Sequence, residues 1–233
     1  MKMHNQLQSN RRRTFLKQFA TGAAALSAGM FSVPLKSSAA ETLSSSDVSD
    51  ADAWFNKLKG KHRMVFDVTQ PHEIFPFAWP KVFLLTNGAT GSPESDCGVV
   101  VILRHNGLGY ALNNGLWEKY KLGEMFKIDD PETKAPALKN PFWQPKPGTY
   151  SAPGLGVVKI GIDELQASGV MFCACDVALT VFTAIVAGST NQDPAAVKKE
   201  WVAGLLPGIQ VVPSGIWAVG RAQEHGCAYC FAS

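Results

Sequence analysis

The chain has 233 residues, 46% of them hydrophobic and 18% charged, which is enough apolar material for one compact domain. Its formal net charge of +3 comes from the first forty residues, because residues 41–233 carry 16 basic against 19 acidic side chains, a charge of −3. A slightly acidic body without runs of Lys and Arg argues against nucleic acid and anionic lipid as partners.

Residues 1–40 contain the parts of a twin-arginine export signal in the expected order. Residues 12–17 match the pattern R-R-x-F-L-K, residues 19–33 form a weakly apolar stretch, and residues 38–40 offer small side chains for cleavage. The apolar stretch is shorter than the roughly 20 residues that a membrane span needs. We predict export to the periplasm by the twin-arginine route and no stable membrane insertion after cleavage. The alternative is a basic tail that is retained.

Strands and helices alternate along the rest of the chain. Continuous apolar runs predict strands at 62–68, 97–104, 170–175, 210–212 and 227–231. Helical spacing predicts helices at 53–58, 80–86, 110–120, 163–168, 177–186, 194–205 and 214–225. Pro76 and Pro80 limit the second of these helices. The alternation predicts a three-layer α/β/α sandwich around a mostly parallel five-stranded sheet.

Residues 129–156 hold six of the fourteen prolines, together with Phe142 and Trp143. An irregular stretch of this length inside a compact domain is usually functional or mobile. These two aromatic side chains either cover a crevice or anchor the loop. The predicted organisation is a signal at 1–40, a solvated leader and short helix at 41–60, and an α/β domain at 61–233 with the insertion at 129–156.

All five cysteines follow the export signal: Cys97, Cys173, Cys175, Cys227 and Cys230. In an oxidising compartment, an odd number leaves at least one thiol unpaired, bound to a ligand or shared between chains. The last two form a C-x-x-C pair, but residues i and i+3 of a strand face opposite sides of the sheet. We therefore expect them to form a redox or metal pair only if the segment turns or coils instead of forming a strand.

Cys175 lies where the strand 170–175 meets the helix 177–186. A helix dipole and free backbone N–H groups favour a thiolate there, and open α/β sheets bind ligands at the carboxyl ends of their strands. Cys173 precedes it by two residues and is expected on the same face, with Cα atoms about 6.6 Å apart. That distance is near the limit for a disulfide, so shared binding of a soft metal is easier. Core packing is the competing explanation for both thiols.

Four further residues are expected at the same carboxyl edge. Arg104 and His105 follow the second strand; either would favour a thiolate, and the histidine could donate a proton to a leaving sulfur. Ser214 and Gly215 begin a helix and could offer N–H groups to an anionic sulfur species. A solvated histidine and an ordinary helix cap are the alternatives.

Residues 169–179, G-V-M-F-x-x-C-x-x-A-L, resemble the cysteine segment of the DsrE/DsrF-like superfamily, which includes YchN and the Tus sulfur-relay subunits. Residues 212–226, V-P-S-G-I-x-x-x-x-R-x-Q-x-x-G, resemble its carboxy-terminal strand, helix and strand. The resemblance covers roughly residues 62–231. It implies a five-stranded α/β/α sandwich, oligomers, and in some members a cysteine that carries sulfur as a persulfide, here Cys175. Most sulfur-relay members are cytoplasmic, so the export signal departs from their pattern.

Three functions remain open from the sequence. The first is an exported thiol protein that binds or carries sulfane sulfur on Cys175. The second is a soft-metal protein, for Cu(I), that uses Cys173, Cys175 and His105. The third is a non-catalytic oligomeric partner. The expected partner is a small sulfur species or a soft metal ion, in a homo-oligomer; the sequence names no cofactor and leaves open whether a reaction is catalysed.

Overall fold

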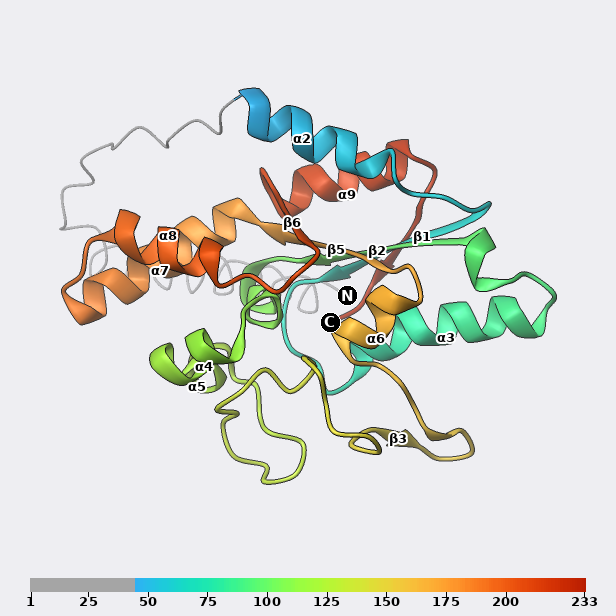
Figure 1. Cartoon of the computed structure of the whole chain (residues 1–233), viewed down its shortest axis with the longest axis horizontal. Coiled ribbons are helices and arrows are strands. Elements are labelled where there is room, and N and C mark those ends of the chain that lie inside the picture. The colour runs from blue at the N-terminus through green and yellow to red at the C-terminus, as the bar shows by residue number, and fades with distance from the viewer. Residues whose placement is uncertain (1–44) are drawn as a thin grey trace, which may run out of the picture. The chain divides into compact units, whose positions relative to one another are not determined.

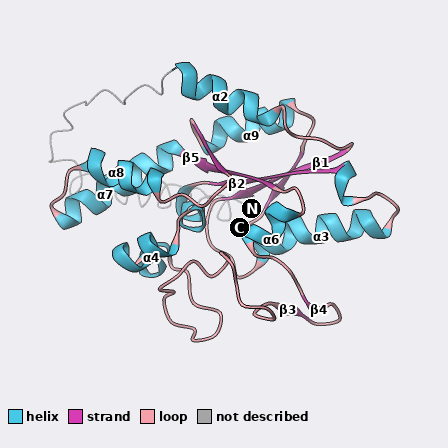
Figure 2. Cartoon of the chain, in the orientation of Figure 1, coloured by secondary structure: helices cyan, strands magenta, loops and turns pink. Residues whose placement is uncertain are grey.

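A parallel five-stranded sheet organises the chain. The computed structural model describes residues 45–233, with side chains from residue 50, so the predicted export signal lies outside the described residues. The strands are β1 (His62–Val68), β2 (Cys97–Leu103), β5 (Met171–Cys175), β6 (Ile209–Val212) and β7 (Ala228–Phe231). Their order is β6-β5-β2-β1-β7 and every pairing is parallel. This confirms the predicted α/β sandwich, shown in Figures 1 and 2.

Helices cover both faces of the sheet. They are α2 (Ser45–Phe55), α3 (Phe75–Ala89), α4 (Asn114–Tyr120), α5 (Leu122–Phe126), α6 (Ile162–Ala167), α7 (Asp176–Thr190), α8 (Pro194–Ala203) and α9 (Gly215–Glu224). Two 3₁₀ helices, η1 (Glu94–Asp96) and η2 (His105–Ala111), flank β2. No described helix is long and apolar enough to cross a membrane.

The strand order explains which helices share a layer. From β1 through β2 and β5 to β6 the chain adds strands in one direction, whereas β7 returns to the far side of β1. Because crossovers between parallel strands are right-handed, the reversal places α9 on the opposite face from α3 and α6. Figure 1 shows α2 beside α9 in this second layer.

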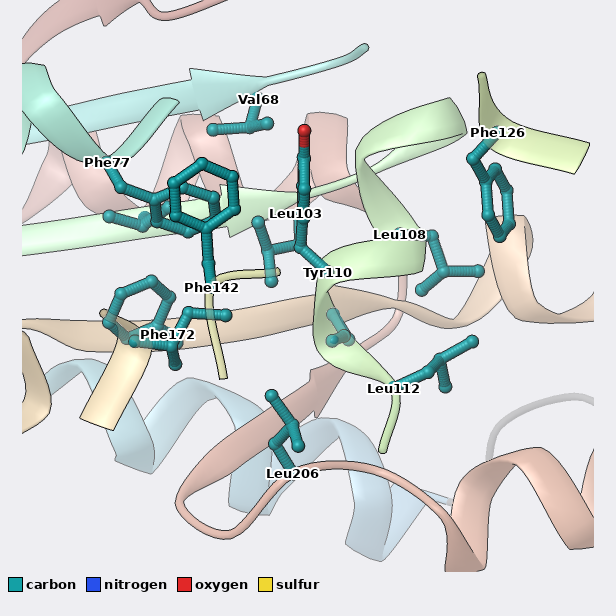
Figure 3. Close-up of a cluster of buried hydrophobic side chains, with 14 of the residues drawn as sticks. Val68, Phe77, Leu103, Leu108, Tyr110, Leu112, Phe126, Phe142, Phe172 and Leu206 are labelled. Atoms are coloured by element: carbon teal, nitrogen blue, oxygen red, sulfur yellow. The ribbon is translucent and has the colours of Figure 1, made fainter. Parts of the chain in front are cut away.

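Each face buries its own apolar cluster. Under α2 and α9, Trp54 and Phe55 pack with Ala218 and Val100. The larger cluster lies on the other face and includes Phe77, Phe172 and Tyr110 (Figure 3). All seven residues of β2 are buried, as the β-branched run 97–103 predicts for a central strand.

The insertion 129–156 is attached to the larger cluster by aromatic rings. Phe142 is 3% exposed, and its ring centroid lies 4.4 Å from that of Phe77 and 4.8 Å from that of Tyr150. Within the segment, β3 (Ser151–Ala152) pairs with β4 (Gly156–Val157) in a short antiparallel ribbon. Phe142 therefore anchors the loop, which was one of the two predicted roles.

Three predicted elements have different boundaries in the structure. The helix predicted at 80–86 is the longer α3, in which buried Pro80 replaces a lost backbone hydrogen bond with core contact. The helix predicted at 110–120 is divided into η2 and α4, because the chain is extended at Leu112 and Asn113 and the Asn113 side chain caps α4. The segment predicted as a solvated leader is helical from Ser45, and Ala51 of this helix is buried in the cluster under α2 and α9.

Candidate functional site

The carboxyl edge of the sheet brings together the strand ends that carry the predicted site residues. Leu103 of β2 pairs with Ala174 of β5, so the next residue of each strand, Arg104 and Cys175, stand at neighbouring positions. Cys175 is itself paired with Val212 of β6. Ser214 and Gly215 follow two and three residues later, at the start of α9.

Cys175 is the N-cap residue of α7. Its Sγ accepts a hydrogen bond from the backbone N–H of Ala178 at 3.3 Å, and its residue surface is 6% exposed. A donor at the start of a fifteen-residue helix stabilises negative charge on sulfur. The carboxylate of Asp176 follows directly, but Lys198 binds it at 2.9 Å and offsets its charge.

Cys173 and Cys175 lie close together but belong to different buried clusters, although their spacing predicts the same face. Cys173 is fully buried in the cluster under α2 and α9, whereas Cys175 packs with the larger cluster. Cys175 ends β5 and also caps α7, so its side chain contacts the start of that helix and the larger cluster. Burial raises the pKa of the Cys173 thiol strongly, and the nearby Cys175 and Asp67 raise it further. A neutral, sealed thiol is suited to core packing.

Arg104 is held by an acid that the sequence analysis did not select. Its Nε and Nη2 atoms donate to the two carboxylate oxygens of Asp67 at 2.7 and 2.8 Å. The Tyr229 hydroxyl donates to the same carboxylate at 2.9 Å. Asp67 is 1% exposed, and its hydrogen bond raises the pKa of Arg104. The sequence does contain a signal for Asp67: it is an acidic residue inside an apolar strand, and a buried carboxylate needs a partner.

Ser214 and Gly215 have structural tasks at this edge. The Ser214 side chain accepts the Trp217 N–H at 3.1 Å, as an ordinary helix cap does. At Gly215, an added Cβ would lie 2.4 Å from the Arg104 Cδ atom, which is closer than atoms can approach. Glycine therefore leaves room for the Arg104 side chain to pass the start of α9 toward Asp67.

His105 reaches the predicted edge, but its ring is directed elsewhere. The residue is exposed, with a left-handed φ of 49°, and its ring meets that of Phe182 with a centroid separation of 6.2 Å. Phe182 follows Cys175 by seven residues, which is roughly 10 Å along the helix axis. The ring is thus placed two turns beyond the Cys175 cap.

Of the other three thiols, Cys97 and Cys227 lie at the amino ends of β2 and β7, whereas Cys230 lies near the carboxyl end of β7. Cys97 begins β2, and burial, with Asp96 and Glu94, raises its pKa. Cys227 packs under α9 and Cys230 against the opposite cluster, as the strand spacing predicted. Burial raises the pKa of Cys227 to about 11 and that of Cys230 as well. Within residues 45–233 no group of three His, Cys, Asp or Glu side chains could hold a metal ion.

Comparison with known proteins gives no family. No protein-family model matches the chain, and no curated protein matches its sequence. One solved structure with a detectable match is a protein of unknown function, MTH1491, from Methanobacterium thermoautotrophicum. It is 17% identical over 73% of this chain and 99% of that chain, with a TM-score of 0.39. A match of that size assigns neither a family nor a function.

The cavities of the molecule are distributed over both edges of the sheet. One, about 1090 Å³, lies at the amino ends of the strands, with Cys97 and Met171 among its lining residues, and none of the six predicted site residues lines it. A smaller one, about 290 Å³, is lined by Asp176, Val212 and Pro213, the immediate neighbours of Cys175 and Ser214. Of these two cavities, the smaller one is therefore the one that lies nearer to the Cys175 thiol.

Proposed function

We propose that this chain is an exported thiol protein that binds or carries sulfane sulfur on Cys175. One observation supports this most directly: within the described residues, Cys175 is the only one of the five thiols that accepts a hydrogen bond from a backbone N–H. In contrast, Cys97 and Cys230 donate to carbonyl oxygens. An acceptor sulfur at a helix start is the arrangement that favours a nucleophilic thiolate.

The proposed step is a transfer of one sulfur atom between thiols. The Cys175 thiolate attacks the outer sulfur of a small persulfide, R–S–SH, so that a new S–S bond forms at Sγ. The S–S bond of the donor breaks at the same time and R–S⁻ leaves, while the proton stays on the transferred sulfur. The exchange is balanced without an external oxidant, because the bound sulfane sulfur keeps its oxidation state.

Arg104 supports this step as a fixed cation at the neighbouring strand end. Its guanidinium stabilises the R–S⁻ that leaves, and the bidentate bond to Asp67 holds the side chain in place. Because Cys175 is only 6% exposed, a donor must be small. Small sulfur species are therefore the proposed partners, and the periplasm is the proposed location.

Self-association is part of the proposal. The exposed side of α7 presents Val177, Val181 and Ile185, which are 54%, 50% and 57% exposed at intervals of one turn. Residues 177–191 carry no charged side chain, so two copies of this face meet without like-charge repulsion. We propose a homo-oligomer of this chain as the occupant of that face.

Mass spectrometry of the mature protein tests the function. The reduced chain is incubated with inorganic polysulfide, and intact and peptide masses are measured. The proposal expects one added sulfur on Cys175, none in Cys175→Ser, and an unchanged increment in the matched control Cys230→Ser. A metal adduct on the same protein after Cu(I) addition would favour the soft-metal function instead. If neither a sulfur adduct nor a metal adduct forms, the function that remains is that of a non-catalytic oligomeric partner.

A further inference from the structure

A third cavity lies away from the capping thiol and has a different chemical character. Its volume is about 470 Å³, within the range of small-molecule sites. It lies between the loop after β1, represented by Pro71 and Ile74, and a wall formed by Ile128 and by Phe142 and Tyr150 of the insertion. None of the residues assigned above to sulfur chemistry lines it.

Tyr110 is a buried polar group of this cavity. The residue is 1% exposed, lines the cavity, and donates its hydroxyl to no described residue. Figure 3 shows its oxygen directed away from Leu112 and Leu206. The neighbouring Tyr150 hydroxyl differs, because it donates to the Pro141 carbonyl at 2.8 Å. Burial raises the pKa of Tyr110, so its hydroxyl stays a donor at neutral pH.

The rim of the cavity is built from an unusual backbone. Glu73, Lys127 and Lys134 line it with φ values of 47°, 56° and 60°, in the left-handed region that side chains other than glycine rarely adopt. Hydrogen bonds fix the segment, including Lys134 N–H to the Asp130 carbonyl at 3.0 Å. Left-handed non-glycine residues held in this way are concentrated at binding sites.

The rim charges do not select an ion of one sign. Lys127 and Lys134 are opposed by Glu73 and Asp129, and all four side chains are exposed. The Asp130 carboxylate is occupied by two backbone N–H groups at 2.9 and 2.8 Å. Selection therefore depends on the interior, which offers aromatic and aliphatic surface and the Tyr110 hydroxyl, which has no hydrogen-bond partner among residues 50–233.

We propose that this cavity binds a small uncharged planar molecule with a carbonyl oxygen. The oxygen accepts a hydrogen bond from the Tyr110 hydroxyl, and the apolar body lies among Ile74, Ile128 and Phe142. The site is independent of the thiol chemistry, because it shares no residue with the Cys175 edge.

Titration of the full mature chain with acetophenone tests the proposal, by calorimetry and by ligand-observed NMR. Saturable binding is expected, and toluene, which lacks an acceptor, is expected to bind about 5-fold more weakly, the value of one hydrogen bond. Tyr110→Phe is expected to weaken the binding of acetophenone by the same factor and to leave the affinity for toluene unchanged. The control Tyr120→Phe removes a hydroxyl that binds Glu200 outside the cavity, and should leave both affinities unchanged.

A second variant does not depend on the buried tyrosine. Ile74→Trp fills the cavity from its half-buried rim and is expected to abolish binding of both probes. Thermal melting of each variant establishes that it is folded. No saturable binding to the native chain, equal affinity in Tyr110→Phe, or retained binding in a folded Ile74→Trp variant would each overturn the proposal.

Discussion

Arg104 and Asp67 form a bidentate ion pair across the carboxyl ends of β2 and β1, with donor–acceptor distances of 2.7 and 2.8 Å. The carboxylate side chain is 2% exposed, whereas the guanidinium side chain retains 23% of its surface. The pair therefore joins a buried acid to a cation that still faces the edge where Cys175 caps α7. It is both a fold contact and the means of fixing the charge beside the thiol.

Replacing Asp67 tests how much the Arg104–Asp67 pair contributes to the stability of the fold. Asp67→Asn keeps the volume but leaves Arg104 and the Tyr229 hydroxyl without their carboxylate, so the free energy of unfolding should fall by about 3 kcal/mol. Urea denaturation measures it. The control is Asp52→Asn, which breaks a 2.7 Å ion pair with Arg221 between two partly exposed side chains and should cost less than about 1 kcal/mol. Equal losses in the two variants would contradict a special role for the buried pair.

The position of Arg104 can be changed without touching either charge. In Gly215→Ala, the new Cβ meets the Arg104 side chain and must displace it. We expect sulfur transfer to Cys175 to slow by about 10-fold, since a misplaced cation loses its effect on the anion. Stopped-flow monitoring of polysulfide consumption measures the rate.

The same helix supplies the matched control. Gly220 has nothing within 4 Å of an added Cβ, so Gly220→Ala should keep the transfer rate and stabilise α9 by about 0.5–1 kcal/mol. A Gly215→Ala protein that reacts as fast as Gly220→Ala would show that the placement of Arg104 does not matter.

The location of the site followed from local sequence, whereas its contacts did not. An apolar run that passes directly into a helical pattern places Cys175 at a strand-to-helix junction, and the structure has β5 ending there. Its side chain contacts the start of α7 and the larger cluster, which the two-residue spacing from Cys173 did not predict. Likewise, Asp67 is visible as an acid in an apolar strand, but its partner depends on β1 and β2 being neighbours. Such long-range register is not encoded in any local pattern.

His105 is a further residue whose position along the chain could be predicted from the sequence, but whose contacts could not. Its place after β2 was predicted, but its φ of 49° and its contact with Phe182 result from how η2 packs on α7. The resemblance to a known superfamily did not supply Asp67 or Tyr229 either. Those residues were found only when the strands were placed side by side.

Cys173 should affect stability rather than chemistry. Cys173→Ser puts a hydroxyl in a fully buried apolar site, where the structure offers no prepared partner, and should lower the free energy of unfolding by about 1–3 kcal/mol. Sulfur loading of Cys175 should persist in the folded variant. Urea melts and intact-mass measurement check the two parts, and loss of loading with unchanged stability would instead make Cys173 a partner in the reaction.

Alkaline pH should destabilise the fold through groups buried in their neutral form. Burial raises the pKa of Cys227 from 9.0 to about 11, so its contribution to stability is complete below the unfolded value and is lost as the pH rises through the folded one. The raised pKa values of Cys173 and Tyr110 act in the same direction. Urea melts at about pH 8 and pH 10.5 should show a lower free energy of unfolding at the higher pH, with a smaller difference in Cys227→Ala. A free energy that rises over this interval would contradict the assignment.

The exposed side of α7 gives the last prediction. Ile185→Lys places a charge on a helix face that has none, within the proposed contact between copies, where like charges would then oppose each other. The oligomer should dissociate to monomer, as measured by light scattering coupled to gel filtration. Leu138→Lys is the control, because Leu138 is 67% exposed in the insertion and outside that face. Since Ile185 is ten residues beyond the Cys175 cap, sulfur loading should persist in the monomer. An Ile185→Lys protein that keeps the native mass would place the contact elsewhere on the surface.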